Sequence, residues 1–284
     1  MIRHTDPGFT KAGKRLAEHA ARFALQLFNE RADNRLVYHS FSKTAAVVEI
    51  LHRLGQENRF DPDLILIAEL AAWMVDTGYL NDYENPVPAS LSWARLCFEK
   101  IGLSPEIQAE ALQTLEAALG SSPPETLSAQ LLHDALLAWH YGEDFTEKSA
   151  LLRLELELAG GRRYSPAEWA RLEWEGLLQS HYFTPKGKLL YSPILTKNLT
   201  EFKSWLDKNP HIHQELDSRP PELFKNLERK TPVSGNQTFF RTNYRNHINL
   251  SAIADNKANI MISVNAILIS VIITILTYKN LTES

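Results

Sequence analysis

The chain has 284 residues, with 34 acidic against 30 basic side chains, which allows one large domain or two small ones. The slightly negative charge argues against a nonspecific nucleic-acid binder, which would carry a basic excess. With one cysteine, Cys97, no intrachain disulfide is possible, and nothing indicates an oxidising compartment. Residues 1–7 lack the apolar core of a secretory signal.

Amphipathic helices are predicted in succession over most of the chain, because apolar residues recur at helical spacing. The predicted ranges are 11–29, 41–54, 61–76, 90–101, 104–119, 128–141, 145–159 and 165–182. Gly55 and Gly102 are expected to end two of them, and Ser165-Pro166 has the pattern of a helix start. Residues 185–209 look less regular. No stretch alternates with a period of two over a useful length, so the sequence predicts an all-α fold.

Three parts of the chain are expected: a helical domain over residues 1–215, a linker over 216–237 and a C-terminal segment over 238–284. The linker is placed by the polar, turn-rich stretches 218–221 and 230–236. Within the last segment, residues 258–278 carry no charged side chain. At ~1.5 Å per residue a helix over this run covers about 30 Å, the thickness of a bilayer core.

That apolar run is interpreted as a transmembrane helix, although a buried core helix or an oligomer helix would fit its polar residues too. Arg241, Arg245 and Lys257 precede it and only Lys279 follows, which places the helical domain in the cytoplasm and the helix in the inner membrane. Between residues 260 and 277 of this run, Asn265 is the one strongly polar side chain. Since such groups usually face protein, we expect helix association through Asn265 in a homo-oligomer.

Several polar side chains of the helical domain could converge. His39 precedes one predicted helix, Asp76 ends another and His133-Asp134 lies within a third. Histidine and aspartate from different helices can bind a divalent metal, because rigid helices hold inward side chains together. Each residue also has a simpler interpretation: a lone histidine is more often a structural hydrogen-bonding residue, and an aspartate at a helix end more often a cap.

The order of these pieces resembles the HD-superfamily metal-dependent phosphohydrolases over roughly residues 8–200. The resemblance is carried by "YHSFSKTAAVVEIL", "AELAAWMVDTGYLNDYENP", "LLHDALLAWHYGEDF" and "SHYFTPKGKLL". It implies an HD-domain-like helical bundle and, in an intact member, hydrolysis by water activated on a metal held by histidine and aspartate.

The chain departs from the family pattern at its metal ligands. Lys43 stands where the resemblance implies a ligating histidine, Val75 replaces the histidine of the His-Asp pair, and Pro86-Val87 replaces a later His-Glu pair. Asp76 and Asp134 survive, and two carboxylates without imidazole make a poor transition-metal site. The fixed charge of Lys43 would also repel a cation. We therefore expect no cofactor and no catalysis, and Asp76 to pair with Lys43 or hold its helix end.

The altered site is either filled or still binds a small ligand. In the second case Lys43 and His39 would hold a phosphate, while Tyr79 or Trp73 would stack on a base, near Asp76 and Asp134. The predicted ligand-binding residues are therefore His39, Lys43, Trp73, Asp76, Tyr79 and Asp134.

The C-terminal stretch "NYRNHINLSAIADNKANIMISVNAILISVIITIL" resembles the start of the membrane domain of Pycsar effectors, bacterial antiphage proteins. The resemblance implies a link to cyclic CMP or cyclic UMP signals. The first hypothesis is therefore a membrane-anchored antiphage effector whose degenerate HD domain senses a nucleotide and whose helices impair the membrane. The alternative is a membrane-anchored HD-type nucleotide phosphohydrolase in which Asp76, Asp134 and His39 hold a metal such as Mn. A scaffold that brings a partner to the membrane is a third possibility.

Overall fold

The computed structural model describes residues 7–31, 33–120, 122–210 and 212. All of them belong to the first of two units into which the chain divides, residues 1–218 and 219–284. The described elements are α1 (Pro7–Glu30), α2 (Phe41–Asn58), α3 (Pro62–Ala72), the short 3-10 helix η1 (Thr77–Leu80), α4 (Pro86–Lys100), α5 (Pro105–Leu119), α6 (Leu127–His140), α7 (Phe145–Leu158), α8 (Pro166–Gln179) and α9 (Pro185–Lys208). This part of the chain is all-helical, which confirms the predicted all-α class.

Local sequence explains where many of these helices begin. The hydroxyl of Ser104 accepts a hydrogen bond from the backbone of α5, and Thr126 and Thr184 do the same for α6 and α9. Ser165 and Glu168 form a complete capping box at the start of α8. Such side chains satisfy amide groups that have no partner in the first helical turn. Proline follows several of these caps, where its missing amide does no harm.

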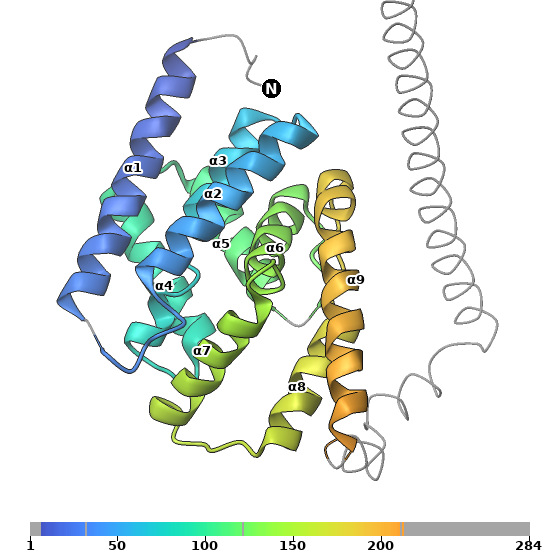
Figure 1. The fold of residues 1–284 in the computed structure, drawn as a ribbon. Helices are drawn as coiled ribbons and strands as arrows, with labels where there is room; N and C mark the ends of the chain where they lie inside the picture. Colours follow the sequence, from blue (N-terminus) through green and yellow to red (C-terminus); the bar gives the residue numbers. More distant parts are fainter. Residues whose placement is uncertain (1–6, 32, 121, 211, 213–284) are drawn as a thin grey trace, which may run out of the picture. The chain divides into compact units, whose positions relative to one another are not determined.

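One hydrophobic core joins α1 to α6 with residues of α7, α8 and α9. In Figure 1, α2 and α3 lie beside α6, and both helices pack against it. Helix α3 also packs on α5, and η1 on α4. The largest fully buried apolar side chains are Leu51, Leu54, Leu70, Met74, Phe98, Leu115, Leu131, Leu132 and Leu177. Helix α7 packs on α6, and α8 pairs with α9 (Figure 1).

Several predicted boundaries were wrong. Helix α2 continues through Gly55 and ends at Asn58, where Arg59 takes a left-handed conformation with φ of 56°. Glycine is needed at position 55 of this helix, because a Cβ there would lie 2.8 Å from the side chain of Ile65. Helix α3 ends at Ala72, before Asp76, and the chain turns over residues 73–76.

The larger correction concerns residues 185–209, which we expected to be irregular. They form α9, a continuous helix that contains Pro193. Prolines usually interrupt helices, but Pro185 lies in the first turn, where it is tolerated. The buried face of Tyr191, Leu195 and Asn198 packs on the rest of the domain and stabilises the helix. Tertiary packing therefore overrides local propensity here.

The described helices include none that is long and apolar enough to cross a membrane. The predicted transmembrane run 258–278, Asn265 and the linker 216–237 all lie outside the described residues.

Candidate functional site

An ion pair between α2 and the turn after α3 forms the centre of the candidate site. The Nζ atom of Lys43 lies 2.8 Å from Oδ1 of Asp76, and the hydroxyl of Thr44 donates to Oδ2 of the same carboxylate over 2.9 Å. Both charged side chains are buried, with 8% of Lys43 and 3% of Asp76 exposed. The pairing of Lys43 with Asp76 that the sequence suggested is therefore present, and both oxygens of Asp76 are used.

Aromatic rings surround the ammonium group of Lys43. Its Nζ lies 4.5 Å from the ring centre of Tyr38 and 5.5 Å from that of Trp139. Aromatic faces carry partial negative charge and attract cations, more strongly where water is excluded. The site thus holds a cation that is part of the protein, between one carboxylate and two rings.

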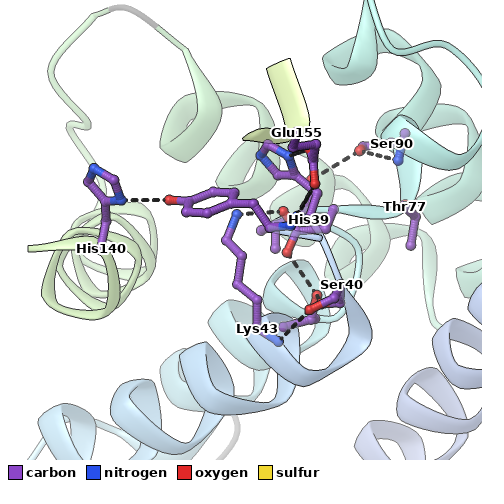
Figure 2. Close-up of polar contacts among 12 residues, drawn as sticks. His39, Ser40, Lys43, Thr77, Ser90, His140 and Glu155 are labelled. Atoms are coloured by element: carbon purple, nitrogen blue, oxygen red, sulfur yellow. Dashed lines mark hydrogen bonds and ion pairs between the residues drawn. The ribbon is translucent and has the colours of Figure 1, made fainter. Parts of the chain in front are cut away.

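A second buried carboxylate, Glu155 of α7, ties the segment before α2 to the loop before α4. Figure 2 shows Glu155 next to His39. Its Oε2 accepts from the backbone amides of Tyr38, over 2.7 Å, and His39, over 2.9 Å. Its Oε1 accepts from Nδ1 of His39 and, over 3.3 Å, from the hydroxyl of Tyr83. Glu155 is fully buried, and this cluster of donors satisfies its negative charge.

The surrounding groups also determine the protonation states of His39 and Glu155. Burial and the nearby Lys43 ammonium lower the pKa of His39, against the opposing effect of Glu155. Burial acts to raise the pKa of Glu155, but the hydrogen bonds from His39 and from the two amides outweigh it and leave that pKa below its ordinary value. At neutral pH the pair therefore consists of an ionised carboxylate and a neutral imidazole that donates from Nδ1.

A cavity with a volume of about 480 Å³ opens beside these groups. Residues from the segment before α2, from α2, from η1 and the loop after it, and from helices α4, α6 and α7 line it. They are Tyr38, His39, Lys43, Tyr79, Tyr83, Glu84, Pro86, His140, Leu152 and Leu156. The volume falls in the range of small-molecule sites, and a mixed aromatic and aliphatic lining with a few polar groups is typical of them.

The turn that carries Tyr79 into this cavity depends on Gly78. A Cβ at Gly78 would lie 1.8 Å from the carbonyl oxygen of Pro86, and its amide donates to the hydroxyl of Ser90 over 2.9 Å. Only glycine therefore fits between η1 and the start of α4. The ring of Tyr79 then stacks on His39, with ring centres 3.5 Å apart.

A chain of polar contacts leads from the cavity to α8. The hydroxyl of Tyr38 lies 2.7 Å from Nδ1 of His140, as Figure 2 shows for the labelled His140. The other ring nitrogen of His140 lies 3.8 Å from the carboxylate of Glu173. Ser149 donates to Glu173 over 2.7 Å and accepts from the indole of Trp169 over 2.9 Å. The cavity wall is thereby coupled to the α8 helix.

Two of the predicted site residues lie elsewhere. The ring of Trp73 stacks on Phe41, with centres 5.8 Å apart, and does not line the cavity. The carboxylate of Asp134 accepts from the backbone amides of Phe183 and Thr184, over 2.8 Å each, and from the Thr184 hydroxyl. Asp134 therefore holds the start of α9, whereas His39, Lys43, Asp76 and Tyr79 come together as predicted.

The described residues include no group of three or more histidine, cysteine, aspartate or glutamate side chains placed to hold a metal ion. At the Lys43–Asp76 pair, a divalent ion would have to displace an ammonium that already neutralises the carboxylate. The arrangement can instead present hydrogen-bonding groups to a small molecule in the cavity.

Sequence reasoning missed Glu155, His140 and Tyr83 as members of this site. Glu155 had a recognisable signal, since Phe145, Ser149 and Leu152 form one helical stripe of α7 and Glu155 continues it. A glutamate on the apolar stripe of a helix needs a partner. Nothing in the sequence indicated that the partner would be the backbone before α2.

No protein-family model matches the chain, and neither do any curated proteins or solved structures.

Proposed function

We propose that this chain is a membrane-anchored antiphage effector of the Pycsar type, with a helical domain that has lost metal-dependent hydrolysis and senses a small ligand. The proposal combines the resemblance of residues 8–200 to HD phosphohydrolases with that of residues 243–276 to Pycsar effector membrane domains. The domain would be a pseudoenzyme located on the cytoplasmic face of the inner membrane.

The buried Lys43–Asp76 ion pair is the main observation that supports the proposed loss of catalysis. By the resemblance to HD enzymes, Asp76 would be the aspartate placed on the metal, and here Lys43 and Thr44 occupy both of its oxygens. Replacing the ammonium with a metal ion would leave a buried, uncompensated lysine charge, which is strongly unfavourable. Water activated by a metal, the nucleophile of the family, then has no source at this site.

The cavity beside the pair supports the sensing role. It is large enough for a small ligand, and its lining includes His39, Lys43, Tyr79 and Tyr83. Lys43 is held by Asp76, His39 and Tyr83 are held by Glu155, and Tyr79 stacks on His39. A cyclic pyrimidine nucleotide, cyclic CMP or cyclic UMP, is the signal that the Pycsar resemblance suggests. To activate the effector, the ligand must bind the active arrangement better than the resting one.

The effect on the membrane is assigned to the C-terminal segment 238–284. Its apolar run would span the bilayer and associate with copies of itself through Asn265 in a homo-oligomer, because a polar group in the hydrocarbon core favours protein neighbours. Rearrangement of these helices would impair membrane integrity.

The deciding experiment measures metal content and hydrolysis on the full-length protein in detergent. The protein would be produced with Mn, Fe and Ni supplied, and its metal would be quantified by mass spectrometry. Hydrolysis of nucleoside mono- and triphosphates would be followed by phosphate release. We expect substoichiometric metal and no turnover above that of Asp76→Ala.

The exposed Asp144 offers a matched control, since Asp144→Asn also removes a carboxylate charge. Stoichiometric metal in the wild-type protein, with turnover that Asp76→Ala abolishes and Asp144→Asn leaves intact, would establish a phosphohydrolase and refute the proposal.

A further inference from the structure

Two tyrosine rings in the wall of the cavity lie at a steep angle to each other. Tyr79 and Tyr83 both line the cavity, with ring centres 5.5 Å apart and ring planes at 66°. Both rings are held in place, because Tyr79 stacks on His39 and the hydroxyl of Tyr83 donates to Glu155 over 3.3 Å. Aromatic faces carry partial negative charge and attract cations, so two fixed rings at an angle can contact a cation from two sides.

The charges around the cavity are more negative than positive. Among the described lining residues, Lys43 is the one lysine or arginine, and Asp76 already neutralises it over 2.8 Å. Glu155 is ionised and buried and bonds to two residues of the wall, and the exposed Glu84 belongs to the lining. One ammonium group therefore stands against three carboxylates. Such a field attracts a cation and repels an anion, more strongly where water is partly excluded.

The two tyrosine hydroxyls lie within this negative field. Burial and the carboxylates of Asp76 and Glu155 raise the pKa of Tyr79, and burial together with Glu155 raises the pKa of Tyr83. A carboxylate that opposes the formation of a phenolate stabilises a positive charge at the same place. The field and the aromatic faces therefore favour the same kind of ligand.

The carboxylates near the cavity offer few hydrogen-bond acceptors to a ligand. Both oxygens of Asp76 already accept hydrogen bonds, and the two oxygens of Glu155 accept four. A primary ammonium group has three N–H donors and would find its acceptor chiefly in Glu84, after giving up its bonds to water. A quaternary ammonium group has no N–H and loses no such bonds.

The apolar part of the lining suits methyl groups. Leu152 and Leu156 of α7 line the cavity together with Pro86 of α4. Contact with these side chains removes the methyl groups of a quaternary ammonium ion from water, which is favourable. The cavity therefore combines negative charge, aromatic faces and apolar surface.

We propose that the cavity binds an organic cation of the quaternary ammonium class, with the charged group against the rings of Tyr79 and Tyr83 and near the carboxylate of Glu84. The inference rests on the proposed sensing function of this cavity. It assigns to the cavity a ligand opposite in charge to the cyclic nucleotide that the resemblance suggests. The same negative field disfavours the phosphate that Lys43 and His39 were expected to hold.

The test uses isothermal titration calorimetry on the full-length protein in an uncharged maltoside detergent. The probes are choline, tetramethylammonium, 3,3-dimethyl-1-butanol, ethanolamine and cyclic UMP. Because 3,3-dimethyl-1-butanol has the shape of choline with carbon in place of the charged nitrogen, choline should bind about tenfold or more tightly than this alcohol. Choline should also bind more tightly than ethanolamine, which carries a primary ammonium. Tetramethylammonium should compete with choline, and cyclic UMP should not.

Two glutamate variants test the role of charge. Glu84→Gln removes one carboxylate from the lining and should weaken choline binding about threefold to tenfold. The melting temperature should stay unchanged, because Glu84 is exposed. Glu143→Gln is the matched control, since Glu143 is also exposed and does not line the cavity, and it should leave choline binding unchanged.

Two variants of Tyr83 separate the ring from the fold. Tyr83→Phe and Tyr83→Leu both lose the hydrogen bond to Glu155, but only Tyr83→Phe retains an aromatic face. Tyr83→Leu should therefore bind choline about tenfold more weakly than Tyr83→Phe. The melting temperatures of the two variants, measured without ligand, show that the comparison is made between folded proteins.

Four results would each overturn recognition of a quaternary ammonium ion: no binding of choline or tetramethylammonium, equal binding of choline and 3,3-dimethyl-1-butanol, unaltered affinity in Glu84→Gln, or equal affinity in the two Tyr83 variants. Cyclic UMP that competes with choline, or that binds alone, would overturn it while leaving the proposed function standing. Stoichiometric metal with turnover would refute the proposed function, whatever the choline titrations give. The two failures are therefore distinguishable.

Discussion

Lys43 and Asp76 form a buried ion pair across α2 and the turn after α3, with Nζ and Oδ1 2.8 Å apart and Thr44 bonded to the second oxygen. Removing two charges from water is costly, and a buried pair is retained only where its geometry and its remaining hydrogen bonds are good. Both conditions are met here, since the rings of Tyr38 and Trp139 surround the ammonium. The pair therefore fixes this part of the fold as well as the chemistry of the site.

Breaking this pair from one side should destabilise the domain strongly. In Lys43→Met the Asp76 carboxylate stays buried without its cation, which is expected to lower the free energy of unfolding by about 3–5 kcal/mol. Adding Asp76→Asn removes the stranded charge and should recover part of the loss. Denaturant unfolding followed by tryptophan fluorescence measures both changes.

An exposed lysine serves as the control for that experiment. Lys197 lies 3.9 Å from Glu201, with both side chains about two-thirds exposed. Lys197→Met should change the free energy of unfolding by no more than about 0.5 kcal/mol. A similar loss in both variants would mean that the buried pair has no special role.

The His39–Glu155 pair predicts how stability depends on pH. The pKa of His39 is below the ordinary 6.5 in the folded protein, so the unfolded chain takes up the proton first as the pH falls. The stability gained from neutral His39 is therefore present above about pH 6.5 and is lost as the pH falls toward the folded pKa. Glu155, whose pKa is also lowered, adds a further loss below the ordinary carboxyl value of 4.5.

Two histidine variants with opposite expected effects test this linkage. His39→Asn cannot titrate and should flatten the fall in melting temperature between about pH 7.5 and pH 5.5. His52 is bonded to Glu69, which raises its pKa, so its contribution is greatest at low pH and His52→Asn should make the fall steeper. Identical slopes in the two variants would contradict the assignment.

Asp134 is predicted to stabilise α9 instead of binding a metal. Asp134→Ala leaves the amides of Phe183 and Thr184 without acceptors, at a cost of about 2–4 kcal/mol. Hydrogen exchange should increase at the start of α9 and stay unchanged in α4, which Asp134 does not contact by any described bond. Asp144→Ala, at an exposed carboxylate, is the control. Unaltered exchange in α9 would count against the role.

Asn265 is the residue on which the membrane proposal can be tested most directly. If polar contacts between transmembrane helices hold the oligomer, Asn265→Leu should reduce growth inhibition on expression in bacteria without changing the melting temperature of the helical domain. Ser284, the last residue in the sequence, gives a matched substitution outside the apolar run, Ser284→Ala. Unchanged toxicity of Asn265→Leu would contradict the proposed association of the helices through Asn265.

The sequence by itself determined the all-α class and most helix starts, because caps, prolines and apolar spacing are local signals. It offered the pairing of Lys43 with Asp76 only as one of two roles for Asp76, and the structure decided between them. Helix ends were less well determined. Gly55 lies inside α2 and Pro193 inside α9, since packing against Ile65 and burial of the Tyr191 face outweigh local propensity.

Only the tertiary structure decided which polar groups meet. Glu155 accepts from the backbone amides of Tyr38 and His39, which lie more than a hundred residues earlier in the chain. The spacing of apolar residues along the sequence cannot predict such a contact. Asp134, which the sequence placed beside Asp76, instead holds the start of α9. Partners so distant in the chain are selected by the need of each buried charge for donors, and that need is met only once the helices are packed.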